Sequence, residues 1–188
     1  MSSTPYPTDP TYEVRFGLVY RDLLLIPSSA VFLAAGILLV GENPFIGVAG
    51  MLLGGGYLAV RLITVLSRRV ALRVDVTGVT LGAVPPWPRT HTATVPWSDI
   101  EAVVLWRQVT GRTSVRYLGL QRRAGLAPLP GSLRSGLLKK MTRSVVPRDV
   151  PLQLAIDSRP VSFWRLDEKR LAEAIDRFSP GVELVRAD

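Results

Sequence analysis

Two long apolar stretches near the start of the chain limit its possible folds more than any other feature. Residues 23–41 contain no charged side chain, and residues 45–66 contain one, Arg61. As helices rising ~1.5 Å per residue, each stretch would measure about 28 Å or more, close to the ~30 Å hydrocarbon core of a bilayer. Two such stretches are rare in soluble domains, so the sequence predicts a transmembrane hairpin at 22–67, with helices at about 22–41 and 44–66.

The charges that flank the two stretches predict the orientation of the hairpin. Basic residues lie before the first stretch and after the second, whereas the connection "GENP" carries one glutamate and no basic residue. Because basic flanks stay on the cytoplasmic side, we expect a two-span plasma-membrane protein with both termini in the cytoplasm and residues 1–21 as a cytoplasmic N-terminal tail. We expect Arg61, near the cytoplasmic end of its span, to extend toward the lipid headgroups.

Small residues in both predicted helices indicate close packing. Gly50 and Gly54 form a G-x-x-x-G pair, and Ala30 and Ala34 form a similar pair of small residues. This pattern favours contact between the two helices of the hairpin. A homodimer through Gly50 and Gly54 is the alternative, and the sequence does not separate the two.

The hydrophobic period changes after residue 69 from helical to alternating. "VALRVDVTGVTLGAV" predicts two strands joined by a turn at Thr77 and Gly78, and further strands are expected near 92–95, 100–108 and 115–120. "VPLQLAI" and "PVSFW" predict two more. The segment "LDEKRLAEAIDRF" then predicts an amphipathic helix that begins after Asp167 and ends before Ser179.

The order of about seven strands followed by one helix resembles that of bacterial pleckstrin-homology-like (PH-like) domain proteins. The residues that carry the resemblance are "LRVDVTGVTL" at 72–81, "VPWSDIEAVVL" at 95–105 and the helix at 166–178. The resemblance implies an α+β membrane protein in which a transmembrane α-hairpin precedes a partly open β-barrel at 68–188. It implies no catalytic residue. Trp97 and Asp99 are expected to be structural, with Trp97 filling the barrel and Asp99 capping a turn.

Several kinds of chemistry are excluded by what the sequence lacks. It has no cysteine and one histidine, His91, so neither a thiol nucleophile nor a zinc site built on Cys and His is available. No phosphate-binding loop, nucleophile elbow or metalloprotease motif is present. We therefore expect no enzyme activity, no metal and no cofactor. Arginine far outnumbers lysine, a bias that is typical of bacteria with GC-rich genomes.

Most of the positive charge lies in one segment of the predicted β domain. Residues 122–149 hold seven Lys and Arg against one Asp, which is six of the net +8 charges. This predicts a basic insertion at about 123–148, in which apolar residues from Leu133 to Val145 recur at helical spacing. The candidate contacts for anionic lipid or a partner are Arg122, Arg123, Arg134, Lys139, Lys140 and Arg143.

Three interpretations of the insertion remain open. A helix at 131–146 could cover the barrel, lie on the membrane with its basic residues at anionic headgroups, or bind a protein partner. Nucleic acid is not expected, because the segment has no aromatic residue for stacking. The sequence predicts a non-catalytic interaction or assembly module at the cytoplasmic face of the membrane. The alternatives are a sensor of anionic lipid or of a small ligand, and an accessory subunit of a membrane enzyme or transporter.

Overall fold

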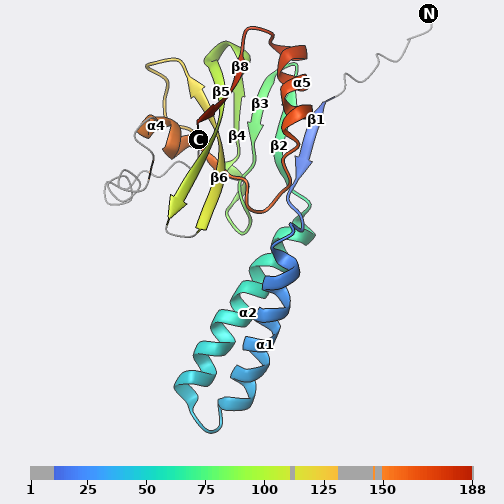
Figure 1. Cartoon of the computed structure of the whole chain (residues 1–188), viewed down its shortest axis with the longest axis vertical. Helices are drawn as coiled ribbons and strands as arrows, with labels where there is room; N and C mark the ends of the chain where they lie inside the picture. The colour runs from blue at the N-terminus through green and yellow to red at the C-terminus, as the bar shows by residue number, and fades with distance from the viewer. Residues whose placement is uncertain (1–10, 111–112, 131–145, 147–149, 188) are drawn as a thin grey trace, which may run out of the picture.

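A computed structural model describes residues 11–110, 113–130, 146 and 150–187. Within these ranges the chain is a mixed α+β structure with two parts. Two long antiparallel helices form a hairpin, which projects from one end of a domain built on two four-stranded sheets (Figure 1).

The helices of the hairpin lie close to the predicted positions. Helix α1 is Asp22–Leu39 and helix α2 is Pro44–Ser67. Asn43 caps α2, because its side chain accepts a hydrogen bond from the Ile46 backbone nitrogen at 3.2 Å, and Pro44 occupies the first turn. Arg68, in the left-handed conformation with φ 46°, ends the helix.

The hairpin exposes its apolar side chains. Only 11% of the apolar window of α1 and 17% of that of α2 are buried, which is unlike the core helix of a soluble protein. Both helices are long and apolar enough to cross a membrane. Their most exposed large side chains include Leu23, Leu24, Leu38, Phe45, Leu52, Leu53 and Leu66.

Glycines form the contact between the two helices. A Cβ at Gly54 would lie 2.6 Å from the Leu33 backbone nitrogen, and a Cβ at Gly50 would lie 3.1 Å from the Gly36 Cα. The Gly50–Gly54 pair therefore packs within the hairpin. Ala30 and Ala34 do not take part, because both are exposed.

The first sheet contains a strand that precedes the hairpin. Its antiparallel order is β1 (Tyr12–Arg15), β2 (Val70–Asp75), β3 (Gly78–Leu81) and β4 (Ala93–Pro96). The hairpin is thus the connection between β1 and β2, and Arg15 pairs with Val70 across the ladder. The segment before the first span, expected to be only a tail, supplies an edge strand.

The second sheet has the order β7-β6-β5-β8. Its long central strands are β5 (Ile100–Thr110) and β6 (Thr113–Arg122), and short strands β7 (Arg159–Pro160) and β8 (Glu183–Ala187) flank them. Strand β8 pairs in parallel with β5. Two 3₁₀ turns, Arg89–His91 and Trp97–Asp99, flank β4.

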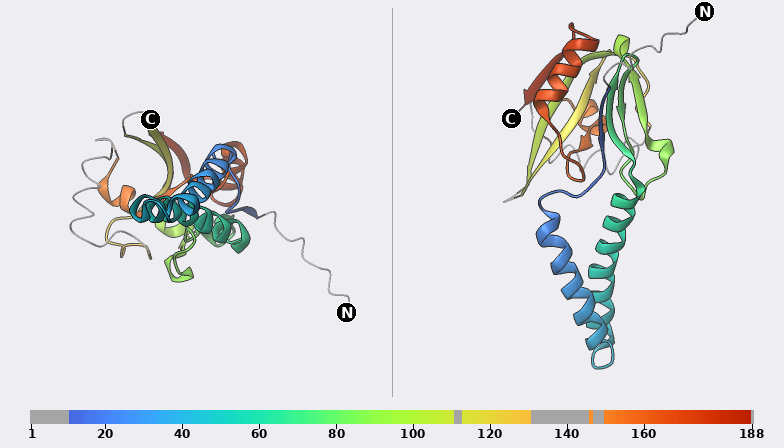
Figure 2. Two further views of the ribbon diagram at one scale, coloured as in Figure 1. Left: turned by 90° about the horizontal axis from the view of Figure 1, so that it is seen from below. Right: turned by 90° about the vertical axis from the view of Figure 1, so that its right-hand side faces the viewer.

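Buried side chains of both sheets, among them Leu72, Val79, Val103 and Leu118, form the main core. Helix α5 (Glu168–Phe178) covers this core where edge strands of the two sheets approach each other (Figure 2). It contacts β1 and β2 of the first sheet and β8 of the second. Leu171 and Ile175 are buried against the core, and the Asp167 side chain accepts a hydrogen bond from the Arg170 backbone nitrogen at 3.1 Å. The predicted amphipathic helix and its cap are confirmed.

Two predicted strands were wrong. "VPLQLAI" contains helix α4 (Leu152–Asp157), and "PVSFW" contributes only Pro160 to β7. Leu152, Leu154 and Ile156 alternate as in a strand, but α4 buries Leu154, Ala155 and Ile156 in succession. Gly119 makes room for it, because a Cβ there would lie 2.8 Å from Leu154 Cδ1. The described strands number eight rather than about seven, and β8 was not predicted. The described sheets are two separate four-stranded sheets and form no closed barrel.

Candidate functional site

The residues predicted to contact lipid or a partner lie only partly within the described structure. Arg134, Lys139, Lys140 and Arg143 lie outside the described residues. Arg122 ends β6, and Arg123 follows it as an exposed residue. Both line a pocket of about 350 Å³ together with Glu101, Gln121, Gln153 and Asp157.

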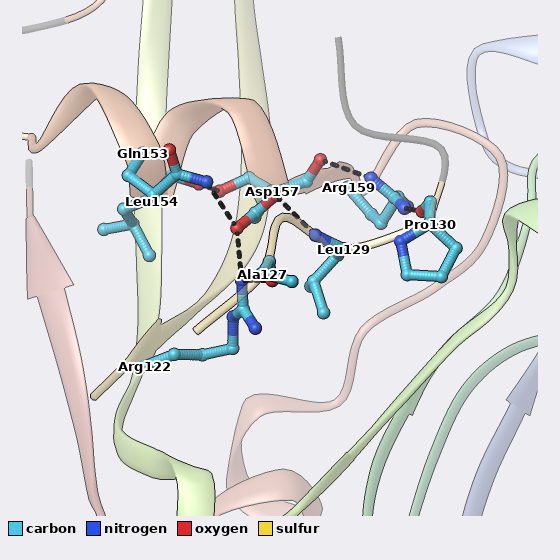
Figure 3. Close-up of polar contacts among 9 residues, drawn as sticks. Arg122, Ala127, Leu129, Pro130, Gln153, Leu154, Asp157 and Arg159 are labelled. Carbon is cyan, nitrogen blue, oxygen red and sulfur yellow. Dashed lines mark hydrogen bonds and ion pairs between the residues drawn. The ribbon is translucent and has the colours of Figure 1, made fainter. Parts of the chain in front are cut away.

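Arg122 is engaged by a buried carboxylate rather than presented to solvent. Its Nη2 lies 3.0 Å from Asp157 Oδ2 and donates to the Ala127 carbonyl at 2.8 Å, and its side chain is 10% exposed (Figure 3). Asp157, 1% exposed, also accepts hydrogen bonds from Gln153 Nε2 at 3.0 Å and from the Leu129 backbone nitrogen at 3.3 Å. Arg122 therefore holds the end of α4 against the loop that follows β6.

The neighbours of Asp157 extend the same polar cluster. Arg159, 9% exposed, donates from Nη2 to the Pro130 carbonyl at 2.6 Å, and its burial lowers the pKa of its guanidinium (Figure 3). Ser158 Oγ donates to the Leu154 carbonyl at 2.7 Å and accepts from Trp106 Nε1 at 2.9 Å. This cluster fixes residues on both sides of the predicted basic insertion.

A second buried polar cluster lies where the hairpin meets the β domain. Asp22, the first residue of α1, forms an ion pair with Arg61 of α2, and their side chains are 5% and 3% exposed. Asp22 also accepts hydrogen bonds from Tyr57 Oη at 3.3 Å and from the Val19 backbone nitrogen at 2.8 Å. The expectation that Arg61 extends to the headgroups was wrong, because a carboxylate at the same level of the hairpin pairs with it.

Arg61 also reaches the β domain. Its Nη2 donates to the Gly17 carbonyl at 3.1 Å, and its guanidinium carbon lies 5.2 Å from the centroid of the Phe163 ring. Phe163 packs against the main core, and its carbonyl accepts a hydrogen bond from the Gly17 backbone nitrogen at 3.0 Å. Within the described part of the chain, Arg61 Nε and Nη1 have no hydrogen-bond partner. The cation–π contact with the Phe163 ring offsets part of the cost of removing these groups from water.

The sequence contained a signal for this pair. Asp22 begins a helix of 18 residues that ends at the hairpin turn, and Arg61 is the eighteenth residue of α2 after that turn. In antiparallel helices of equal rise, residues equally far from the turn lie at the same level. Opposite charges at the same level predict an ion pair.

Trp97 is structural as expected, whereas Asp99 is not a cap. Trp97 packs against the main core and donates from Nε1 to the Asp75 carbonyl at 2.8 Å. No side chain caps the turn Trp97–Asp99, and the Asp99 carboxylate instead accepts a hydrogen bond from Ser98 Oγ at 3.1 Å.

Neither polar cluster resembles a metal centre. Among the described residues, no group of three or more His, Cys, Asp or Glu side chains is placed to hold a metal ion. The buried groups in both clusters are arginine–carboxylate pairs and their hydrogen-bond partners, which brace secondary structure elements against one another. Comparisons with protein-family models, with curated proteins and with solved structures find no match.

Proposed function

We propose that this chain is a membrane-anchored interaction module without catalytic activity. In this proposal α1 and α2 cross the bacterial plasma membrane, and the β domain lies at its cytoplasmic face, where it recruits or assembles a protein partner. The hairpin would serve to present the domain as well as to tether it.

The contact of Arg61 with both parts of the molecule carries this proposal. A flexible tether would need no contact beyond the covalent connection. Here the hairpin enters and leaves through paired strands β1 and β2, and Arg61 is held by Asp22, the Gly17 carbonyl and the Phe163 ring. Such a joint would hold the β domain in one orientation relative to the hairpin, which favours assembly on a defined surface.

The charge distribution supports the cytoplasmic orientation of the domain. The end of the hairpin that meets the domain is flanked by Arg15, Arg21, Arg68 and Arg69, whereas the opposite turn carries Glu42 and no basic residue. Short loops rich in arginine are retained in the cytoplasm during insertion.

The arrangement of α5 supports a PH-like fold for the β domain. A helix that lies against β1 and β8, which are edge strands of the two sheets, would close one side of a partly open barrel. Two features depart from the expected pattern: β8 follows the helix, and the hairpin lies between the first two strands.

Single-cysteine labelling tests the topology cleanly because the chain has no cysteine of its own. Glu42→Cys places a thiol in the hairpin turn, and Ser98→Cys places one on an exposed residue of the domain. With a membrane-impermeant maleimide, we expect E42C to be labelled in intact cells and S98C only after permeabilisation. Release of the chain from membranes by alkaline carbonate would contradict the anchor, and the reverse labelling would contradict the orientation.

Purification from gently solubilised membranes tests the interaction. We expect a stoichiometric partner to be recovered with the native chain and to be reduced when Asp22→Asn with Arg61→Met removes the Arg61 contacts of the joint without leaving a buried unpaired charge. Equal recovery with both would contradict the role of the fixed orientation. Absence of any stoichiometric partner at native expression would contradict the interaction module itself.

A further inference from the structure

A pocket lined by arginines lies beside the end of α2. Its volume is about 430 Å³, and it forms where the end of β1, the connection from α2 to β2 and the 3₁₀ turn before β4 converge. The lining residues are Arg15, Ser67, Arg68, Arg69, Val70, Ala83, Arg89 and Thr92. Four of these eight residues are arginines, and none is acidic.

The four arginines are only partly neutralised by the protein. Arg15 pairs with Glu13 at 2.8 Å, and Arg69 Nη1 donates to the Trp87 carbonyl at 2.7 Å. Within the described residues, the side chains of Arg68 and Arg89 make no hydrogen bond and no ion pair, and both residues are exposed. Their guanidinium groups remain available to a ligand.

Convergence of like charges is unfavourable unless an anion relieves it. Guanidinium groups suit oxyanions, because their paired N–H donors match two oxygens of a phosphate or of a carboxylate. Ser67 and Thr92 add hydroxyl groups to the lining, although the Ser67 hydroxyl already donates to the Thr64 carbonyl at 2.8 Å. The pocket thus combines charge and donors that fit a phosphate group.

The position of the pocket indicates where the phosphate would come from. On the proposed function, α2 leaves the membrane at this end. Leu62 and Leu66 are exposed on the last turns of the helix, and Trp87, 61% exposed, lies beside Arg69. Aromatic residues of this kind lie at the level of the headgroups, which is also the level of lipid phosphates.

We propose that the pocket of Arg15, Arg68, Arg69 and Arg89 binds the phosphate group of an anionic glycerophospholipid from the bilayer that holds the hairpin. This inference rests on the proposed membrane insertion. The site lies outside the predicted basic insertion at 123–148.

Titration of the full chain in detergent with phosphatidylglycerol, followed by native mass spectrometry, tests the site. Arg68→Gln with Arg89→Gln removes the two arginines that have no partner. We expect the dissociation constant of the first phosphatidylglycerol to rise at least about tenfold. The control, Arg21→Gln with Arg165→Gln, removes the same amount of charge from exposed arginines outside the pocket. It should change the dissociation constant of the first phosphatidylglycerol less than about twofold.

The remaining arms separate the possible sources of the effect. If the control variant loses as much affinity for phosphatidylglycerol as R68Q/R89Q does, the effect is general charge attraction, and the site is overturned. Unchanged affinity in R68Q/R89Q would overturn the site as well. Displacement of the lipid by an equal concentration of inorganic phosphate would assign the pocket to free phosphate and overturn the lipid ligand.

Arg89→Glu alone provides a variant that removes no observed contact, and it should weaken binding without lowering the unfolding temperature. Cysteine labelling of E42C reports insertion independently, so failure of the anchor and failure of the site give different results.

Discussion

Asp22 and Arg61 face each other across the hairpin at the level where it enters the β domain, and both side chains are almost completely buried. The pair connects three segments, because Arg61 also contacts the Gly17 carbonyl and the Phe163 ring. Its loss should therefore affect the hairpin and the domain together.

Replacement of Arg61 by methionine should strongly destabilise the chain. It leaves the Asp22 carboxylate buried without its cation, which costs about 3–5 kcal/mol in comparable buried pairs. The measurement is the unfolding midpoint of the full chain in detergent. The double variant D22N/R61M should recover most of the loss, and an R61M midpoint equal to that of the native chain would contradict the importance of the pair.

Enlargement of Gly54 should separate the helices of the hairpin. An alanine Cβ there would lie 2.6 Å from the Leu33 backbone nitrogen, so G54A should lower stability by about 1–3 kcal/mol. Gly56 is the matched control, because a Cβ at that helical position meets no atom within 4 Å. G56A should leave the thermal midpoint unchanged or slightly higher. Equal effects of the two substitutions would show that the glycine face is not a packing surface.

Asp157→Asn should loosen the loop that follows β6. The substitution keeps the size of the side chain but removes the charge that pairs with Arg122, and a loss of about 3 kcal/mol is expected for a buried pair. Asp176→Asn, on the exposed face of α5, should stay within about 0.5 kcal/mol of the native chain. Faster proteolysis between β6 and α4 in D157N alone would support the bracing role, and equal proteolysis of both variants would contradict it.

Two surface glutamates should make stability depend on acid pH. Hydrogen bonds from Arg116 and, to a smaller extent, Arg186 hold the pKa of Glu168 below its usual 4.5. Hydrogen bonds from Arg73 and, to a smaller extent, Arg15 lower the pKa of Glu13 in the same way. A carboxyl whose pKa is lower in the folded state stabilises it above the unfolded pKa, and this contribution is lost as the pH falls through the folded pKa.

The unfolding midpoint should therefore fall as the pH is lowered below about 4.5, and E13Q/E168Q should flatten that fall. Glu173→Gln, on an exposed residue of α5, should not change the slope. Identical pH profiles of the native chain and E13Q/E168Q would contradict the contribution of these ion pairs.

The parts of the fold that were predictable from sequence are those with a strong local period. The apolar lengths predicted α1 and α2, the alternation predicted β2 to β6, and the amphipathic face predicted α5. Helix α4 was misjudged because six residues are too few for alternation to distinguish a strand from a buried helix. Strand β8 was missed because its pairing with β5 is distant in sequence and three of its five residues are exposed, so no buried alternation marks it.

The candidate sites were less predictable because they depend on residues far apart in the chain. The arginines of the pocket come from β1, the end of α2 and the turn Arg89–His91, and only the folded sheet brings them together. Counting from the hairpin turn would have found the partner of Arg61, but no comparable rule would have placed Phe163 beside it.

The placement of the hairpin between β1 and β2 has a consequence for the order of biosynthesis. Strand β1 leaves the ribosome before either helix, yet its partner β2 is synthesised only after both. The nascent chain must therefore hold Tyr12–Arg15 without its β2 partner until both helices have been synthesised. If the helices insert into the membrane as proposed, integration would precede closure of the first sheet. A chain that failed to form its hairpin would also lack the edge strand of its folded domain.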